Sequence, residues 1–253
     1  MGYLKEFVGE CFVVARLSPP RQAAKWFVGV AVRLPSILRT KSLGPADDFV
    51  GSRILIRGRG QRLCFEESGL GVAREIFGHK CYGDMRGLIP CRHILDLGAN
   101  TGLFAHYALR ENPDAFVTLV DIQPQLCAGA SSNLAHNGFA QRAVVVNAIV
   151  GGIATDWARQ YVRLHPEIPS FDIGRYVESV GECDFLKCDI EGAEFPLFET
   201  RAPWLKRVRR MAIEYHWDHS AGERLKSCLE GAGFHVVRRP RRSLGYLLCD
   251  RVD

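Results

Sequence analysis

The chain has 253 residues, 47% of them hydrophobic and 24% charged, which suffices for one α/β domain with an N-terminal addition. Its nine cysteines are odd in number and lack Cys-x-x-Cys spacing, which argues against a zinc site and a disulfide framework and favours reduced thiols in the cytoplasm. The formal net charge of +5 comes from residues 1–41, with seven basic and two acidic side chains, so a uniformly basic nucleic-acid binder is not indicated.

The N-terminal segment is expected to form two amphipathic helices, residues 3–15 and 22–39, separated by Pro19-Pro20. Two interpretations are open. The helices pack on the edge of the domain, or their basic amphipathic faces rest on a membrane or on a lipid-like acceptor. The apolar stretch 26–32 is much shorter than the about 20 residues that a membrane-spanning helix needs.

Residues 43–48 are interpreted as a linker. We therefore predict a helical, basic N-terminal extension with a linker over residues 1–48 and a second domain over residues 49–253, with its core starting near residue 74. This second domain begins with a predicted hairpin of two strands, residues 53–57 and 61–66.

From residue 93 onward strands alternate with helices, which is typical of a parallel sheet covered on both faces. The predicted strands are 93–97, 116–121, 142–148, 184–189, 208–215, 235–238 and 244–250, and the predicted helices are 103–110, 124–136, 193–200 and 221–231. The connection 239–243 is too short for a crossover, so the last two strands should be antiparallel. The expected fold class is α/β, a seven-stranded, mostly parallel sheet with an antiparallel last strand, as in the Rossmann-like class I methyltransferase fold.

The first strand ends in a glycine turn, Asp-Leu-Gly-Ala-Asn-Thr-Gly over residues 96–102. Gly98 permits a tight turn and close approach of a ligand, and Asn100 with Thr101 can cap the following helix. A dinucleotide site wants a glycine where Asn100 stands, so the turn favours S-adenosylmethionine over NAD. The cofactor-binding candidates in this turn are Asp96, which can reach the amino-acid end of the cofactor, Gly98, Asn100, Thr101 and Gly102.

The ends of the second and third strands supply further cofactor-binding candidates. Asp121 lies about 20 residues past the glycine turn, where an acid can bind both ribose hydroxyls, and Ile122 can lie against the adenine. Alternatively, Asp121 caps the helix that begins at Pro124. Asn147 and Ala148 are expected to contact the adenine edge.

Ionisable side chains gather at the end of the fourth strand, Asp-Phe-Leu-Lys-Cys-Asp-Ile-Glu-Gly-Ala-Glu over residues 184–194, and of the fifth, Ile-Glu-Tyr-His over residues 213–216. Such groups are costly at a buried strand end unless they pair or take part in chemistry. The catalytic candidates are His216, Asp189, Glu191, Glu214 and Lys187, with Glu194 nearby, and Asp189 also counts among the cofactor-binding candidates.

The segments 96–102, 185–194 and 213–216 together resemble the FkbM family of methyltransferases, and the similarity extends from about residue 74 to residue 234. The resemblance implies methylation of a hydroxyl, on a sugar, glycolipid or secondary metabolite, with S-adenosylmethionine as donor. Asp121 departs from the family pattern, in which glutamate is more common at this position. Both acids can bind a ribose diol, so the departure changes little.

Methyl transfer to a hydroxyl requires positioning of the acceptor and is helped by a base. The preferred base is His216, because its unperturbed pKa is about 6.5, followed by Asp189 and Glu191. Lys187 shares a strand face with Asp189 and is expected to hold Asp189 or Glu191. The alternative is a divalent cation on Asp189, Glu214 and His216, although no dedicated metal spacing is present.

Two other functions stay open. The basic runs Lys206-Arg207, Arg209-Arg210 and Arg238–Arg242 suit an RNA substrate, but the segment after the fourth strand lacks the Asn/Asp-Pro-Pro-Tyr/Phe pattern of base N-methylation. The chain can also bind S-adenosylmethionine without catalysis.

A small-molecule hydroxyl acceptor is the expected partner, and residues 151–170 are a candidate lid over it. The expected location is the cytoplasm, with contact to a membrane surface as the alternative.

Overall fold

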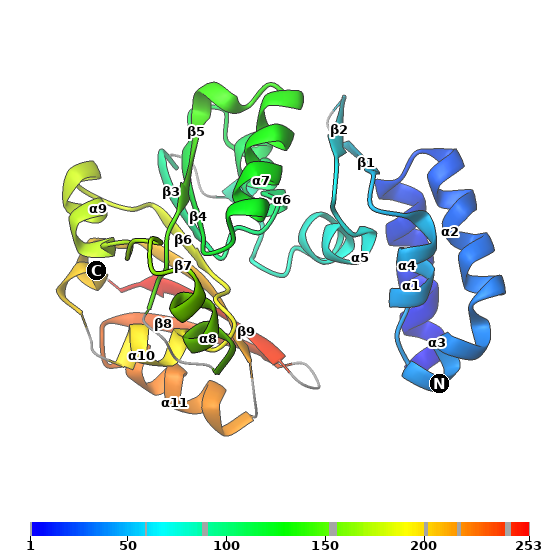
Figure 1. Ribbon diagram of the computed structural model, residues 1–253. Coiled ribbons are helices and arrows are strands. Elements are labelled where there is room, and N and C mark those ends of the chain that lie inside the picture. The colour runs from blue at the N-terminus through cyan, green and yellow to red at the C-terminus, as the bar shows by residue number, and fades with distance from the viewer. Residues whose placement is uncertain are drawn as a thin grey trace. The chain divides into compact units, whose positions relative to one another are not determined.

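Figure 1 shows the computed structural model, which describes residues 2–58, 60–87, 91–151, 156–199, 202–216, 219–240 and 244–252. The chain forms two compact units, Met1–Cys81 with Ala135–Gly138, and Tyr82–Leu134 with Phe139–Asp253. The boundary predicted after residue 48 falls inside the first unit. None of the described helices has both the length and the apolar composition needed to cross a membrane.

The first unit is built from short helices and a hairpin. Its elements are α1 (Gly2–Leu17), α2 (Pro20–Val32), α3 (Leu34–Thr40), α4 (Gly44–Val50), β1 (Ile54–Gly58), β2 (Gln61–Phe65), α5 (Leu70–Ala73) and a π-helical turn (Arg74–Gly78). The antiparallel hairpin is confirmed. The single helix predicted over 22–39 is two helices, because Pro35 in the first turn of α3 cannot continue α2.

The prediction of a linker at residues 43–48 is wrong. Residues 44–50 form α4, whose Ala46, Asp47 and Val50 are buried. Pro45 lies in the first turn, where proline is tolerated, and Ala46 and Val50 are one turn apart on one face. The Gly-Pro pair looked like loop composition, but here it starts a helix.

A buried polar network joins α2, α4 and the π-helical turn of the first unit. Asp47 accepts hydrogen bonds from Nε1 of Trp26 at 2.8 Å and from Nε and Nη2 of Arg74 at 3.1 and 2.6 Å. Arg74 also donates to Glu10, whose other oxygen lies 2.8 Å from Nε2 of His79. Asp47 and Arg74 are both more than nine-tenths buried, so each charge is stabilised by the other and not by water.

Replacing Asp47 with alanine is therefore expected to lower the free energy of unfolding by about 3 kcal/mol, because Trp26 loses its buried acceptor and Arg74 keeps only Glu10. Asp48→Ala is the matched control, since Asp48 is the next residue of the same helix but exposed, and it should cost less than about 0.5 kcal/mol. Urea unfolding of both variants provides the comparison. Equal stabilities would show that the network contributes nothing.

The second unit contains the predicted seven-stranded sheet. Its strands are β3 (His93–Leu97), β4 (Phe116–Asp121), β5 (Ala143–Asn147), β6 (Phe185–Cys188), β7 (Arg210–His216), β8 (Phe234–Pro240) and β9 (Leu244–Arg251), in the order β5-β4-β3-β6-β7-β9-β8. Neighbours from β5 through β7 are parallel, and β9 is antiparallel to both β7 and β8. This confirms the expected Rossmann-like class I methyltransferase fold.

Helices cover this sheet. They are α6 (Leu103–Glu111), α7 (Pro124–His136), α8 (Asp156–Leu164), α9 (Ile173–Val180), α10 (Glu194–Glu199) and α11 (His219–Glu230). In Figure 1, α6 and α7 lie together beside β4 and β5, and α10 and α11 lie together near β8. Strand order reverses between β3 and β6, and in such sheets a crevice opens at the carboxyl ends of the strands on either side of the reversal.

Helices α8 and α9 were not predicted from the sequence. Asp172 caps α9 by accepting a hydrogen bond from the amide of Arg175 at 3.0 Å, and Gly181 ends that helix, so the signals of a helix were present. The candidate lid over 151–170 includes α8, while residues 152–155 of that segment lie outside the described residues.

Candidate cofactor and active site

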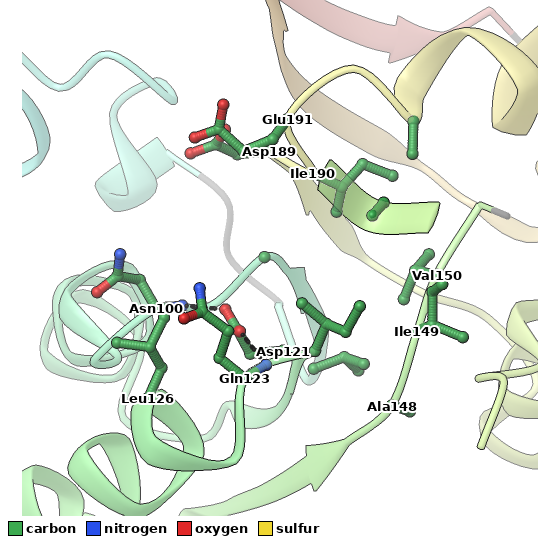
Figure 2. A pocket seen from close by; sticks show the side chains of 15 residues that line it. Asn100, Asp121, Gln123, Leu126, Ala148, Ile149, Val150, Asp189, Ile190 and Glu191 are labelled. Carbon is green, nitrogen blue, oxygen red and sulfur yellow. Dashed lines mark hydrogen bonds between the residues drawn. The ribbon is translucent and has the colours of Figure 1, made fainter. Parts of the chain in front are cut away.

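A pocket opens at the carboxyl ends of β3, β4, β5 and β6 in the second unit (Figure 2). The side chains and backbone that line it are Gly98, Asn100, Val120, Asp121, Ile122, Gln123, Leu126, Ala148, Ile149, Val150, Ala158, Asp189, Ile190, Glu191 and Ala193. Six predicted cofactor-binding residues are among them, namely Gly98, Asn100, Asp121, Ile122, Ala148 and Asp189. Apolar side chains mix with a few acids and amides, as is usual for small-molecule sites.

The glycine turn brings the backbone of β3 against the end of β6. Gly98 has a φ of +73°, and a Cβ added to it would lie 1.7 Å from the carbonyl oxygen of Asp189. The amide of Gly98 donates to the carbonyl of Val120 at 2.9 Å. Only glycine satisfies both the conformation and the close approach at this point.

Asn100 and Thr101 do not cap α6 as predicted. The N-cap position of α6 is Gly102, with a φ of +84° and no side-chain capping bond. Asn100 has a left-handed φ of +51°, and its Oδ1 accepts instead from the amide of Thr101 at 2.7 Å. Thr101 is buried, and its carbonyl accepts from Nδ2 of Asn133 at 3.0 Å. Thr101 and Gly102 therefore support the turn without lining the pocket. Of the three residues, only Asn100 lines it.

Asp121 ties the first two strand ends together. Its Oδ2 accepts from the amide of Asn100 at 2.8 Å and its Oδ1 from the amide of Gln123 at 2.9 Å, as the dashed lines in Figure 2 show. The bond to the amide of Gln123 lies directly before α7, which agrees with the capping role considered as an alternative. Because each carboxylate oxygen has a second lone pair, this fixed side chain can still accept from a ligand hydroxyl.

Asn147 does not line the pocket. Its Nδ2 donates to the carbonyls of Asp121 and Ile122 at 3.0 and 2.8 Å, so both amide hydrogens are used within the protein. Asn147 thus fixes the backbone that carries Asp121, and its contact with the adenine edge stays a prediction. Ala148, the next residue, does line the pocket.

A buried ion pair lies under the glycine turn. Asp96 and Lys187 are register partners on β3 and β6, and Nζ of Lys187 lies 3.2 Å from Oδ1 of Asp96. Burial disfavours the ammonium, but Asp96 and then Asp189 outweigh it and raise the pKa of Lys187. Nζ also donates to the carbonyl of Gly98 at 2.6 Å.

Neither member of this pair lines the pocket, and Asp96 is fully buried. The contact of Asp96 with the cofactor stays a prediction. Lys187 was expected to pair with Asp189 or Glu191. Its main ion-pair partner is instead Asp96, and its Nζ lies farther from Oδ2 of Asp189, at 3.8 Å.

Tyr82 links two of the predicted catalytic acids. Its hydroxyl is 2.9 Å from Oδ2 of Asp189 and 2.8 Å from Oε2 of Glu214. A phenol has a single proton, so it donates to one carboxylate at a time unless the other is protonated. Burial, and then the neighbouring Asp189, raises the pKa of Glu214 to about 7. Tyr82 was not among the site residues predicted from the sequence, because it lies 107 positions before Asp189 and 132 positions before Glu214 in the chain.

His216 lies among four carboxylates. Its Nδ1 is 3.6 Å from Oε1 of the buried Glu194, and its Nε2 is 3.5 to 4.0 Å from oxygens of Asp189, Glu191 and Glu214. The nearby carboxylate of Glu194, followed by the attraction of the other acids, outweighs burial and raises the pKa of His216 to about 9. The pKa of His216 in this site thus lies above the unperturbed value from which it was preferred as the base, and its role as the base stays a prediction.

Asp189, Glu214 and His216 also form a group that can hold a metal ion. One ligand atom from each lies within 4.8 Å of the others, and Nδ1 of His216 faces Glu194 while Nε2 faces the acids. A histidine that binds a metal commonly has its second ring nitrogen on a carboxylate, so the donor set fits a divalent cation.

Comparisons with known proteins cover most of this unit. A family model described as "Methyltransferase FkbM domain" matches residues 96–246, which include every predicted cofactor-binding and catalytic residue but not Tyr82. A tRNA1(Val) (adenine(37)-N6)-methyltransferase from Vibrio parahaemolyticus serotype O3:K6 (strain RIMD 2210633) is 31% identical over 141 residues, or 51% of this chain and 57% of that protein. The chain thus spans little more than half the length of this curated relative.

Solved structures are similar at low identity. An O-methyltransferase family protein from Burkholderia thailandensis is 12% identical with a TM-score of 0.49, covering 72% of this chain and 57% of its own. The methyltransferase domain of METTL16 is 16% identical with a TM-score of 0.48, covering 71% of this chain and 68% of its own.

Proposed function

The chain belongs to the methyltransferase FkbM domain family, and from this membership we propose that it is an S-adenosylmethionine-dependent O-methyltransferase. The proposed acceptor is a hydroxyl of a small molecule such as a sugar, glycolipid or secondary metabolite. The observation that carries the proposal is that the acids Asp189 and Glu191 line the same pocket as Asp121 (Figure 2).

The cofactor is proposed to occupy the part of the pocket nearest β3 and β4. Gly98 offers bare backbone there, and Asp121 offers two fixed acceptor oxygens suited to a ribose diol. Ile122 and Leu126 supply apolar surface for the adenine. When bound, S-adenosylmethionine supplies a methyl group on a positively charged sulfur, which the acidic pocket favours electrostatically.

Asp189, rather than His216, is proposed as the base. Asp189 lines the pocket, whereas His216 is absent from the lining and faces the carboxylates. The carboxylate of Asp189 accepts the proton of the acceptor hydroxyl as that oxygen forms its bond to the methyl carbon. Tyr82 and His216 hold Asp189 in place from either side.

Methylation of RNA is the second candidate, favoured by the name of the Vibrio relative and by the basic runs near residues 206–210. The segment after β6 argues for a hydroxyl acceptor, because it reads Asp-Ile-Glu-Gly and not Asn/Asp-Pro-Pro-Tyr/Phe. A non-catalytic role as an S-adenosylmethionine-binding protein is the third, and the acids that line the pocket speak against it.

Two measurements test the proposal. Calorimetry with S-adenosylmethionine and S-adenosylhomocysteine should show binding of both, and absence of binding would overturn it. Methyl transfer from labelled donor should then be screened with sugars, glycolipids, hydroxylated metabolites and RNA transcripts in parallel. Labelling of RNA alone would replace the O-methyl proposal by the second candidate, and labelling of amino groups alone would overturn it. Donor binding without transfer to any acceptor would favour the third.

Asp121→Asn is expected to weaken S-adenosylmethionine binding about tenfold, because it removes the charge and one of the two acceptor oxygens. Asp114→Asn is the matched control, since Asp114 is an exposed acid that precedes the same strand at its other end. The dissociation constants from calorimetry should differ by this factor, with melting temperatures recorded for both proteins. Unchanged binding in Asp121→Asn would show that this acid only caps α7.

A further inference from the structure

Helix α2 has two apolar faces, of which one is buried in the first unit and the other is exposed. Its inward face buries Ala23, Trp26 and Gly29. The other face is exposed and carries apolar side chains at positions three, four, seven and eight apart, Ala24, Phe27, Val28, Ala31 and Val32. Phe27 is 41%, Val28 53% and Val32 58% exposed. We call these five residues the α2 stripe.

The neighbouring helices of the same unit continue this exposure. Val8 and Phe12 are one turn apart on α1, and Leu34 and Leu38 are one turn apart on α3. Of the thirteen exposed large apolar side chains among the described residues, seven lie on α1, α2 and α3. Single exposed apolar residues need no explanation, but a helical stripe with such neighbours marks an interaction surface.

The charge around the α2 stripe is positive. Arg21 precedes it within α2, and Arg33, Arg39 and Lys41 follow it, all exposed. Residues 1–41 contain only two acids, and one of them, Glu10, is paired with Arg74 and His79. An apolar helix face with flanking cations and little opposing charge is complementary to an anionic bilayer surface.

We propose that α2 and α3 bind the surface of an anionic lipid bilayer. The α2 stripe enters the boundary between headgroups and acyl chains, and Arg21, Arg33, Arg39 and Lys41 contact the lipid phosphates. This proposal does not rest on the proposed methyltransferase activity, because it concerns side chains of the first unit only. It makes the protein peripheral to the membrane, since none of its described helices is able to cross one.

Co-sedimentation of the full chain with vesicles tests the proposal. Binding is expected to vesicles of equal parts phosphatidylglycerol and phosphatidylcholine, to weaken steeply with added salt, and to be much weaker to phosphatidylcholine alone. The double variant Phe27→Ser, Val28→Ser should bind anionic vesicles about tenfold or more weakly, because two large side chains no longer leave water. Arg33→Glu with Arg39→Glu should also bind more weakly.

Val144→Ser is the matched control, since Val144 is 43% exposed on β5 of the second unit, and its vesicle binding should equal that of the wild type. Circular dichroism and melting temperature confirm that each variant folds. Absence of binding to anionic vesicles, or equal binding by the Phe27→Ser, Val28→Ser variant, would overturn the proposal. So would sedimentation-velocity evidence of a dimer that this variant dissociates, because the α2 stripe would then contact a second copy.

Discussion

Gly98→Ala is expected to lower the free energy of unfolding by about 3 kcal/mol and to abolish measurable binding of S-adenosylmethionine. The added Cβ would lie 1.7 Å from the carbonyl oxygen and 2.7 Å from the carbonyl carbon of Asp189. Neither strand can move away at low cost. The amide of Asp189 donates to the carbonyl of Leu97 at 3.0 Å, and Lys187 donates to the carbonyl of Gly98 itself.

Gly181→Ala is the control that distinguishes the steric clash in Gly98→Ala from the strain of a positive φ. Gly181 has a φ of +80°, close to that of Gly98, but an added Cβ would have no atom within 4 Å. Its substitution should therefore cost only about 1 kcal/mol, from the positive φ alone, and leave donor binding intact. Denaturant unfolding and calorimetry of the two variants make the comparison. Similar losses in both would mean that the contact between the β3 and β6 ends does not shape the site.

Asp189→Asn is expected to lower kcat for methyl transfer by about 10²- to 10⁴-fold, using the best acceptor from the screen. Asparagine keeps the shape and an oxygen for Tyr82 but is not basic. The KM for S-adenosylmethionine should change by less than about threefold, because Asp121 and the Gly98 turn are untouched. Initial rates with labelled donor at saturating acceptor give both constants.

His216→Gln decides between the two candidate bases. If His216 only positions the acids, its loss should lower kcat less than Asp189→Asn does. A larger loss in His216→Gln would return the role of base to the histidine.

Chelation tests whether a metal ion is needed. Activity lost on chelation and restored by Mg²⁺ or Mn²⁺ would assign Asp189, Glu214 and His216 to a cation, and Asp189 would no longer be the base.

Local patterns were sufficient for the sheet and for much of the pocket. Strands alternate with helices as far as β8, and the predicted connection 239–243 leaves no room for a crossover, so the antiparallel end of the sheet followed from chain length alone. Gly98, Asp121 and Asp189 each come directly at a strand end. Because parallel strands present their carboxyl ends on the same edge, these residues had to converge. The α4 helix was missed because a Gly-Pro pair is equally typical of loops and of first helical turns.

Roles that depend on distant partners could not be obtained in this way. Tyr82 is joined to Asp189 and Glu214 only by the packing of the second unit, and nothing in its own neighbourhood marks it. His216 has an ordinary sequence context, yet four acids from two strand ends surround it and raise its pKa to about 9. Asn147 lies at the end of β5 as predicted, but its side-chain amide donates to the backbone carbonyls of Asp121 and Ile122.

The sequence by itself determined the fold class, the edge of the sheet that carries the pocket and the family, because these follow from periodicity, strand order and short contiguous motifs. Only the tertiary structure decided which side chains line that pocket, which are ion-paired beneath it, and which face of α2 is left exposed. Those properties depend on distances between residues far apart in the chain, and both burial and electrostatic interactions vary with such distances.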